Sequence, residues 1–537
     1  MLWLGLYLPR LALEVFERGS LVREPSPGPV AGDRPDSGAL PALAICNRTH
    51  VLAANQVAQA QGVLPGISRA GALALASELL LRSRDPQREQ EALAGVAAWA
   101  LQFTPAVSLQ QELRTAKASS GLSPGDSAAG LLLEVEPSLR LFGGRAALIE
   151  RIRAGVGSLG FTAQAAYAPT PRGAWLLARH RDGSGCDEPA QLRALLAPLP
   201  VELLDSARAQ RAALEAVGVR SIGSLLALPR AGIARRFGKQ VLIELDRALG
   251  ALPEPRNWFA LPATFCARLE LLGAIDNAAM LLFAGNRLLL QMSGWLAARQ
   301  SAVRQFELWC EHDGQSATVI PVRLTEPSRE PQRLCTLLRE HLAVTRLAAP
   351  VYALQLRSGE VFDMAADNRD LFQGANNVAE DLARLIERLQ ARLGSERVRH
   401  FHLADEHRPE RAYWSEMIAD VGPLAARTAR ASSRVSVATA NAPPDDTAIA
   451  VPAQPRPLWL LPQPIALGER GQRPFHGSAL ALLAGPERIE AGWWDQHGVQ
   501  RDYFIAEDSD HRLLWIFQER LPDPAGRQGW FLHGLFG

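Results

Sequence analysis

Residues 125–144, GDSAAGLLLEVEPSLRLFGG, decide how the first half of the chain folds. The centre, residues 130–135, is a short apolar run with one acid, and this pattern predicts a buried strand. Residues 139–144 look like a strand that runs out into a glycine turn. Such a strand can carry carboxylates to a metal site, yet residues 128–130, where acids would be needed, are Ala-Ala-Gly.

Strand and helix patterns alternate on both sides of this stretch. Residues 2–8 are a continuous apolar run of strand length, and residues 162–168 form another strand-like piece. Helical periodicity is found in residues 87–103 and 145–159. The order of strand, helix, two strands, helix and strand predicts a ferredoxin-like α+β layer.

Composition and patterning predict an α+β chain with several domains. These are a ferredoxin-like layer (1–10 and 86–185), an inserted subdomain (11–85), a helical part (186–252), a second α+β domain (260–365), a helical extension (366–424), a disordered linker (425–456) and a β-rich C-terminal module (457–537). The linker is assigned because it is rich in Ala, Ser, Thr, Pro and Asp and has few large apolar residues.

The charge balance gives no global argument for nucleic acid. Lysine and arginine number 57 against 56 aspartates and glutamates, so any basic patch must be local. The 5 cysteines are scattered without CxxC spacing, which predicts neither a zinc site nor a disulfide framework and fits a reducing cytoplasm. Arg10 interrupts the apolar N-terminus, and no stretch approaches the ~20 apolar residues of a membrane span, so we expect a cytoplasmic chain without a membrane partner.

Residues 214–239 contain a candidate DNA-binding hairpin. The run LEAVGVRSIGSLLALP (214–229) predicts a helix, a Gly-x-x-x-x-Gly turn and a second helix, and the basic run RRFGK (235–239) follows. Such a turn can direct backbone N–H groups at a phosphate, with cationic side chains nearby. The candidate DNA-binding residues are Gly218, Arg220, Gly223, Arg235, Arg236, Gly238 and Lys239. A plain helical hairpin with a solvated basic face explains the same pattern equally well.

Several motifs, taken in order, resemble the Y-family of translesion DNA polymerases. FTPAV (103–107) is similar to the family's YTPVVE segment, and LEV followed by SLRLFG (133–143) is similar to its LDV…RLFG strand. AQAQGVLPGI (58–67) resembles its fingers motif. The resemblance spans roughly residues 1–365. It implies a polymerase-like right hand, in which the ferredoxin-like layer is the palm, the inserted subdomain the fingers, the helical part a helix-hairpin-helix thumb and the second α+β domain the little finger.

The same resemblance implies that the family's chemistry is missing. Y-family polymerases hold two Mg²⁺ ions with carboxylates, because this metal needs hard oxygen ligands. The carboxylate positions fall on Gly5, Tyr7, Ala129 and Gly130. The ribose-discriminating aromatic, the two triphosphate contacts of the fingers and the two lysines of the last palm helix fall on Arg10, on Gln56 and Gln59, and on Pro171 and Trp175. We therefore expect no catalytic residue, no metal ion and no cofactor.

An active polymerase with atypical metal ligands is the alternative. Its acids would be Asp126, Glu134 or Glu136, of which the last two share a face if both lie on one strand.

The tail narrows the resemblance to the ImuB family, which are catalytically inactive Y-family homologues. GPERIEAGWW (485–494), RDYF (501–504) and GWFLHGLFG (529–537) are similar to that family's tail. The resemblance implies a scaffold in SOS-induced error-prone translesion synthesis, cytoplasmic and nucleoid-associated when on DNA. It also implies the partners: the β sliding clamp, a RecA-like ImuA-type protein, an error-prone DnaE-type polymerase and DNA bound without sequence preference. A DNA-binding regulator with no clamp partner is the competing class.

Two short segments are the candidate contacts with partner proteins. A clamp-binding peptide needs a polar lead and two apolar anchors, as in the run Asn368, Arg369, Asp370, Leu371 and Phe372. A Leu-Phe pair that docks the following helix is the alternative. The partner-binding candidates of the tail are Trp493, Trp494, Trp530 and Phe531, although these aromatics can equally form the module's core. The linker would let the tail reach one partner while the rest sits on clamp and DNA.

Overall fold

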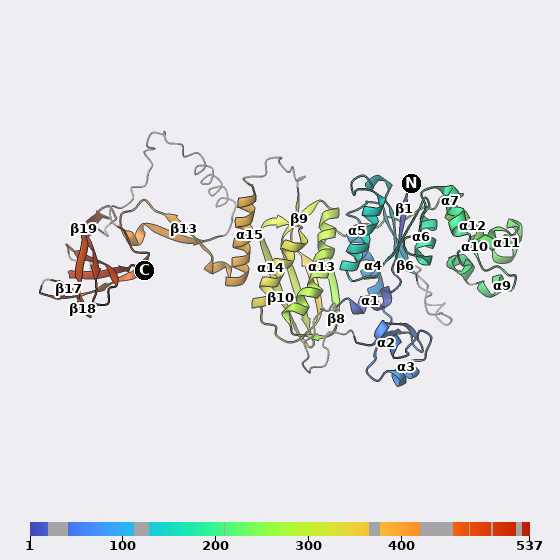
Figure 1. The fold of residues 1–537 in the computed structure, drawn as a ribbon, viewed down its shortest axis with the longest axis horizontal. Coiled ribbons are helices and arrows are strands. Elements are labelled where there is room, and N and C mark those ends of the chain that lie inside the picture. Colours follow the sequence, from blue (N-terminus) through green and yellow to red (C-terminus); the bar gives the residue numbers. More distant parts are fainter. Residues whose placement is uncertain are drawn as a thin grey trace. The chain divides into compact units, whose positions relative to one another are not determined.

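The chain folds into two compact units, Met1–Phe372 and Gln373–Gly537. The computed structural model describes residues 1–19, 41–111, 128–208, 210–364, 376–418, 455–471, 473–495, 498–521 and 529–537. The first unit contains two α+β domains, a small subdomain and a group of short helices (Figure 1). Along the described part of the chain, every helix is too short or too polar to span a bilayer.

An antiparallel four-stranded sheet, in the order β5-β6-β1-β7, forms the centre of the first unit. Its strands are β1 (Trp3–Tyr7), β5 (Val107–Gln111), β6 (Ala129–Glu134) and β7 (Gln164–Ala168). The two middle strands, β1 and β6, are almost entirely apolar, so both of their faces can be buried. This strand order is the ferredoxin-like order, and the predicted palm layer is confirmed.

Helices cover both faces of the sheet. α4 (Pro86–Ala100) and α5 (Arg145–Ser158) pack on the face that carries Leu4 and Leu131. α6 (Pro171–His180) packs on the opposite face, with Leu132. α1 (Leu11–Glu17) adds its apolar residues to the first of these cores.

The exit from β6 differs from the strand expected at residues 139–144. β6 ends at Glu134, and Glu136–Ser138 form a 3-10 helix that is followed by turns. Pro137 has no N–H for a strand ladder, and Gly143 and Gly144 take φ values of +79° and +99°. Glu134 and Glu136 therefore do not share a strand face.

The inserted subdomain is a small sheet with two short helices. Its strands are β2 (Leu43–Cys46), β3 (Val51–Ala54) and β4 (Leu80–Ser83), in the order β3-β2-β4, and its helices are α2 (Gln56–Ala60) and α3 (Arg69–Leu75). The predicted helical part comprises α7 (Pro189–Leu196), α8 (Asp205–Arg208), α9 (Arg211–Glu215), α10 (Ile222–Leu226), α11 (Arg230–Phe237) and α12 (Lys239–Leu249). Both parts have the secondary structure expected of fingers and thumb.

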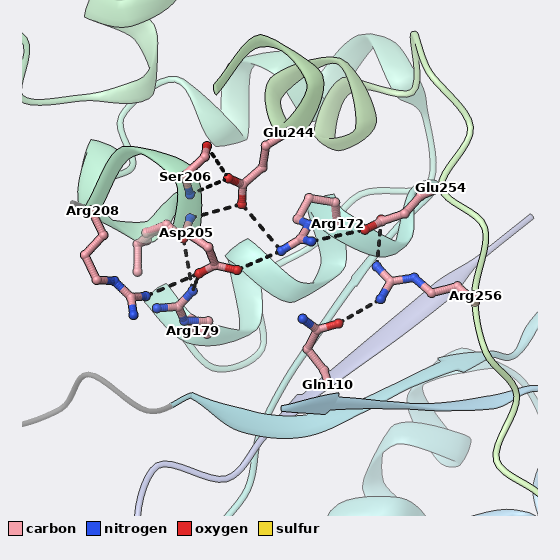
Figure 2. A network of polar contacts seen from close by, with 10 residues as sticks. Gln110, Arg172, Arg179, Asp205, Ser206, Arg208, Glu244, Glu254 and Arg256 are labelled. Atoms are coloured by element: carbon pink, nitrogen blue, oxygen red, sulfur yellow. Dashed lines mark hydrogen bonds and ion pairs between the residues drawn. The ribbon is translucent and has the colours of Figure 1, made fainter. Parts of the chain in front are cut away.

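A network of ion pairs fastens the helical part to the sheet layer (Figure 2). Arg172 of α6 lies at its centre and contacts Asp205 at 3.0 Å, Glu244 at 3.4 Å and Glu254 at 3.2 Å. The Glu244 carboxylate also accepts hydrogen bonds from the backbone N–H groups of Asp205 and Ser206, which begin α8. Because the Arg172 guanidinium pairs with carboxylates of α8, α12 and the segment after α12, these ion pairs fix the position of all three relative to α6.

The segment after α12 is held along the edge of the sheet. Arg256 pairs with Glu254 at 2.6 Å and donates to the Gln110 side chain of β5 at 2.7 Å (Figure 2). The Phe259 N–H donates to the Val107 carbonyl of the same strand at 2.7 Å. The connection to the next domain is therefore ordered by β5.

The second α+β domain has the predicted class. Its strands are β8 (Cys266–Ile275), β9 (Ser301–His312), β10 (Gln315–Ser328), β11 (Val351–Ser358) and β12 (Val361–Asp363), and its helices are α13 (Ala278–Ala298) and α14 (Pro331–Val344). The sheet order is β10-β9-β11-β8, with β12 on β9. α13 packs closely on α4, because Trp99 lies against Gly294, where an added Cβ atom would stand 2.4 Å from the indole.

The second unit is β-rich, as predicted for residues 457–537, and adds a ribbon that was not predicted. Its elements are α15 (Asn376–Leu393), β13 (Arg399–Leu403), β14 (Tyr413–Met417), β15 (Trp459–Ala466), β16 (Gly468–Arg470), β17 (Arg473–His476), β18 (Ser478–Ala479), β19 (Ala481–Ala491), β20 (Val499–Glu507), β21 (Leu513–Glu519) and β22 (Gly529–Leu535). β13 and β14 form the ribbon, in a stretch expected to be only a helical extension. The main sheet has the order β15-β22-β21-β20-β19.

Candidate functional site

β1 and β6 bring together three of the four positions on which, by the family resemblance, the polymerase carboxylates fall. Tyr7 pairs with Gly130 in the register of the two strands, and Gly5 lies two residues before Tyr7 on the same face. Ala129 belongs to the opposite face and to the core under α4 and α5. Three of the four positions therefore meet at one place, on the side of the sheet that α6 covers.

α6 fills that place with Trp175. The indole is 1% exposed and stands edge-on to the Tyr7 ring, with the ring centroids 5.8 Å apart. A Cβ added at Gly130 would lie 2.1 Å from a backbone oxygen of β1 and 2.7 Å from the Trp175 ring. A Cβ added at Gly5 would lie 2.6 Å from the Ala174 carbonyl oxygen. Neither glycine has room for an acidic side chain, so this face is packed core.

The candidate substitute acids do not converge on this place. Glu136 is exposed in the 3-10 helix and pairs with the N-terminal amine of Met1 at 2.5 Å. Glu134 is half-buried at the end of β6, and Asp126 lies outside the described residues. Across the described residues, no group of three or more His, Cys, Asp and Glu side chains is placed to hold a metal ion.

Apart from Trp175 itself, the positions on which the family resemblance places the nucleotide contacts have local partners or face solvent. Arg10 pairs with Glu17 at 3.1 Å, and the Gln59 amide donates to the Ala54 carbonyl at 2.6 Å. Gln56 is exposed, and Pro171 is the first residue of α6. None of these side chains is directed to the Trp175 face by a contact in the described structure.

The N–H groups at the end of the turn at residues 218–223 donate hydrogen bonds within the protein. The N–H groups of Ile222 and Gly223 donate to the carbonyls of Leu199 and Ala197 at 2.9 Å and 2.8 Å, and that of Ser224 donates to the Ser221 hydroxyl. A Cβ at Gly223 would lie 2.9 Å from the Ala197 oxygen, so this glycine serves close packing. The expected phosphate cradle at Gly218–Gly223 is therefore corrected: Gly218 and Arg220 are exposed, but the amides of α10 are taken.

The next turn, between α11 and α12, leaves its donors open. Gly238, which precedes α12, has a φ of +88°, and no described residue accepts from the N–H groups of Gly238 or Lys239. The side chains of Arg235, Arg236 and Lys239 are exposed and form no ion pair in the described structure. By contrast, neighbouring arginines are neutralised: Arg211 pairs with Glu202 and Glu215, and Arg230 pairs with Asp246.

Of the four partner-binding candidates of the tail, two are exposed and two are buried. Trp493 is 83% exposed and Trp494 is 55% exposed, and the two indoles contact each other edge-on at 5.2 Å. Trp530 and Phe531 are buried in the two cores of the main sheet, so they cannot form a docking surface and that expectation is corrected. The clamp-binding candidates Asn368 to Phe372 and most of the linker, residues 425–454, lie outside the described residues.

A buried histidine lies in the aromatic core of the tail. The His533 ring is 1% exposed, and its Nδ1 shares a 2.9 Å hydrogen bond with the Tyr503 hydroxyl. Arg501 donates to the same hydroxyl at 3.2 Å and pairs with Glu410 at 2.9 Å. Burial lowers the pKa of His533 to about 4, with the Arg501 charge acting in the same direction and Glu410 against it.

This chain is similar to known proteins both in sequence and in structure. Protein ImuB from two strains of Caulobacter vibrioides is 30% identical over 497 residues, which cover 89% of this chain and 100% of each relative. Among solved structures, an insertion ternary complex of Dbh DNA polymerase (14% identity, TM-score 0.34) and DinB from Sulfolobus solfataricus (13% identity, TM-score 0.33) each align over 68% of this chain and 100% of theirs. No model of a protein family matches the chain.

Restoring an acid at Gly130 should destabilise the fold. We expect Gly130→Asp to lower the free energy of unfolding by ~3 kcal/mol or more, because the new side chain meets the β1 backbone and Trp175 and buries a carboxylate. Urea denaturation of the full chain measures the change. Gly157→Ala in α5 is the matched control, since a Cβ there meets nothing within 4 Å, and it should be neutral or stabilising. A Gly130→Asp protein as stable as wild type would contradict the packed-face interpretation.

The tail module should lose stability in mild acid. His533 is neutral in the fold, with a pKa of about 4 against an ordinary value of 6.5, so the unfolded chain binds the proton more tightly. The free energy of unfolding is therefore highest above about pH 6.5 and falls by about 3 kcal/mol as the pH drops to about 4. Hydrogen exchange of the β20 to β22 peptides measures this loss. His533→Gln should remove the dependence in this window and exposed His476→Gln should keep it; the same acid response in both variants would refute the assignment.

Proposed function

Because the chain belongs to the ImuB family, we propose that it is a non-catalytic scaffold in SOS-induced, error-prone translesion DNA synthesis. The observation that carries the proposal is the packing of Trp175 against Gly5, Tyr7 and Gly130. Two-metal polymerase chemistry needs carboxylates that can hold Mg²⁺ near the growing strand. The buried Trp175 indole and the α6 backbone leave no room for acidic side chains at Gly5 and Gly130, which supports a role that needs only the shape of a polymerase.

DNA is the first proposed partner, bound through phosphates and without sequence preference. The turn before α12 combines backbone N–H groups that have no acceptor among the described residues with the exposed side chains of Arg235, Arg236 and Lys239. Backbone amides at a helix start and unpaired cations are the groups that contact phosphate oxygens. Arg220, at the exposed end of the neighbouring hairpin, is proposed as a further contact.

Proteins are the other proposed partners. We propose that Leu371 and Phe372 anchor the chain in the β sliding clamp, with Asn368, Arg369 and Asp370 as the polar lead, on the strength of the sequence alone. The exposed pair Trp493 and Trp494 is the proposed docking surface for an ImuA-type or DnaE-type partner. The proposed location is the cytoplasm, on the nucleoid when DNA is bound.

A primer-extension assay tests the proposal directly. We expect no incorporation by the purified chain on a primed template with Mg²⁺ or Mn²⁺, while an active Y-family polymerase extends the same primer. The shape-dependent function should be retained, so a gel-shift experiment under the same conditions should detect DNA binding. Template-dependent incorporation that is lost in Glu134→Ala or Glu136→Ala would instead establish the alternative, an active polymerase with atypical ligands.

The unpaired cations of the thumb should account for much of the DNA affinity. Replacing Arg235, Arg236 and Lys239 together by glutamine removes three phosphate contacts, so the slope of log affinity against log salt should fall by about 2 to 3 and affinity at low salt by ~10-fold or more. Fluorescence anisotropy with a primed duplex measures both. The control Arg211→Gln/Arg230→Gln removes arginines that already pair with carboxylates and should change affinity by less than ~2-fold. An equal loss in both proteins would show that general charge, and not this turn, binds DNA.

A further inference from the structure

A short segment that precedes the linker is fastened to the tail module that follows it. The Arg408 guanidinium donates to the two carboxylate oxygens of Asp495, from Nη1 at 3.0 Å and from Nη2 at 2.6 Å. These two residues are 87 positions apart in the chain, and Asp495 directly follows the exposed Trp493 and Trp494. Arg411 pairs with the same carboxylate at 2.7 Å. One acid of the tail therefore binds two arginines of the earlier segment.

A second ion pair joins the same two parts of the chain. Glu410 pairs with Arg501 of β20 at 2.9 Å, and Arg501 also pairs with Glu519 of β21 at 3.1 Å. The same arginine donates to the hydroxyl of Tyr503, which is buried in the aromatic core of the main sheet. The segment is thus attached both to the turn after β19 and to the middle strands of the sheet.

Arg408 is the central residue of this contact. Its side chain is 2% exposed, and its guanidinium carbon lies over the Trp494 ring at 5.7 Å from the centroid. Glu406 accepts from the same guanidinium at 2.6 Å. A cation withdrawn from water is stable only while its carboxylate partners stay in place, and a two-pronged pair with a carboxylate fixes direction as well as distance. Separation of the segment from the tail would leave this charge with one partner fewer.

Hydrogen bonds within the segment hold its shape. The Ala404 N–H donates to the Ala412 carbonyl at 2.8 Å, and the Arg411 N–H donates to the Arg408 carbonyl at 2.9 Å. The charged side chains of Arg408, Glu410 and Arg411 are therefore presented together on one turn. A contact between parts that are already ordered loses less conformational entropy than one between flexible chains.

The described residues on both sides of residues 419–454 belong to the same compact unit. Before this range, the Gln390 amide of α15 donates to the Ile418 carbonyl at the end of the ribbon at 2.8 Å, beside a small buried apolar cluster. After it, Arg456 pairs with Glu487 of β19 at 2.7 Å. The chain thus leaves from the ribbon and returns to the tail module, which the Arg408 contact joins to the ribbon.

We propose that α15, the ribbon and the tail module form one docking body, which the contact between Arg408 and Asp495 closes across the linker. The linker then starts and ends on this body, so its length does not determine how far the tail reaches. Arg408 also holds the neighbouring Trp493 and Trp494 in position. A role of these indoles in binding a partner rests on the proposed function, whereas the closure of the body rests on the contacts above.

A cut in the linker tests the closure. A specific protease site is introduced into the full chain within residues 425–454, the stretch predicted to be disordered, and the cut protein is analysed by gel filtration with mass measurement. We expect the two fragments to elute together at the mass of one chain. Asp495→Asn removes the acid that Arg408 and Arg411 share, so a dilution series should show the association of its fragments weakened by ~10-fold or more.

Matched variants separate this contact from a general loss of charge. Asp502→Asn removes an acid that pairs with Arg488 inside the tail module, so its fragments should associate as in wild type. Arg408→Gln changes only the segment before the linker and should weaken the association as Asp495→Asn does. It therefore reports on the contact even if Asp495→Asn unfolds the tail, and hydrogen exchange of the β20 to β22 peptides shows whether the tail is folded.

Three results would overturn the proposal. The first is separation of the wild-type fragments on the column, and the second is unchanged association in both Asp495→Asn and Arg408→Gln. The third is elution at the mass of two chains that is lost in these variants, because the segment would then bind the tail of a second copy. The measurements use neither DNA nor a partner protein, so the closure can fail while the scaffold function holds, and the reverse is equally distinguishable.

Discussion

The rest of the first unit depends on the contact between α6 and the two glycines of the central strands. Because Gly5 and Gly130 have no side chains, the helix lies close enough for its backbone and Trp175 to touch β1 and β6. The same helix carries Arg172, which binds the carboxylates of the helical part (Figure 2). One helix thus closes the palm face and fixes the thumb. A metal site in this place would require α6 to move, and the thumb anchor with it.

Some arginines pair with carboxylates and stabilise the fold, whereas others have no carboxylate partner in the described structure and are available to contact other molecules. Lys117 and Lys239 are the only lysines, so arginine carries nearly all of the positive charge. Around α6 the guanidinium groups meet carboxylates, whereas Arg235 and Arg236 face solvent without such partners. A planar fork of donors serves a buried ion pair and a phosphate equally well. Neither the residue type nor the net charge of +1 indicates which arginines are available for a ligand. That depends on where the acidic side chains lie.

The classes of the layers were predictable from sequence, and their local details were not. The apolar runs of β1 and β6 predicted these strands well, because a strand that is buried on both faces must be apolar at nearly every position. The order of the motifs then predicted the class of the neighbouring domains. The exit at 139–144 was predicted wrongly because apolar residues there resemble a strand, while Pro137 and the positive φ of Gly143 turn the chain away. The sequence predicts that Gly5 and Gly130 stand where the family has acids, but it could not predict how closely α6 packs there. That packing depends on a contact between Gly130 and Trp175, which are 45 residues apart in the chain.

The tail shows why composition could not distinguish a core from an interface. Trp515 and Trp530 lie on β21 and β22, and both faces of this sheet carry a buried cluster. A side chain on these strands is therefore buried whichever face of the sheet it points to. Trp493 and Trp494 come after the end of β19 and after Gly492, whose φ is +80°, where alternation no longer directs side chains inward. The buried Arg408 lies over the Trp494 ring and pairs with Asp495 at 2.6 Å, so this exposed corner is held in place without being covered. Two indoles that are ordered yet exposed lose little conformational entropy on contact, which is the property that a protein-docking surface requires.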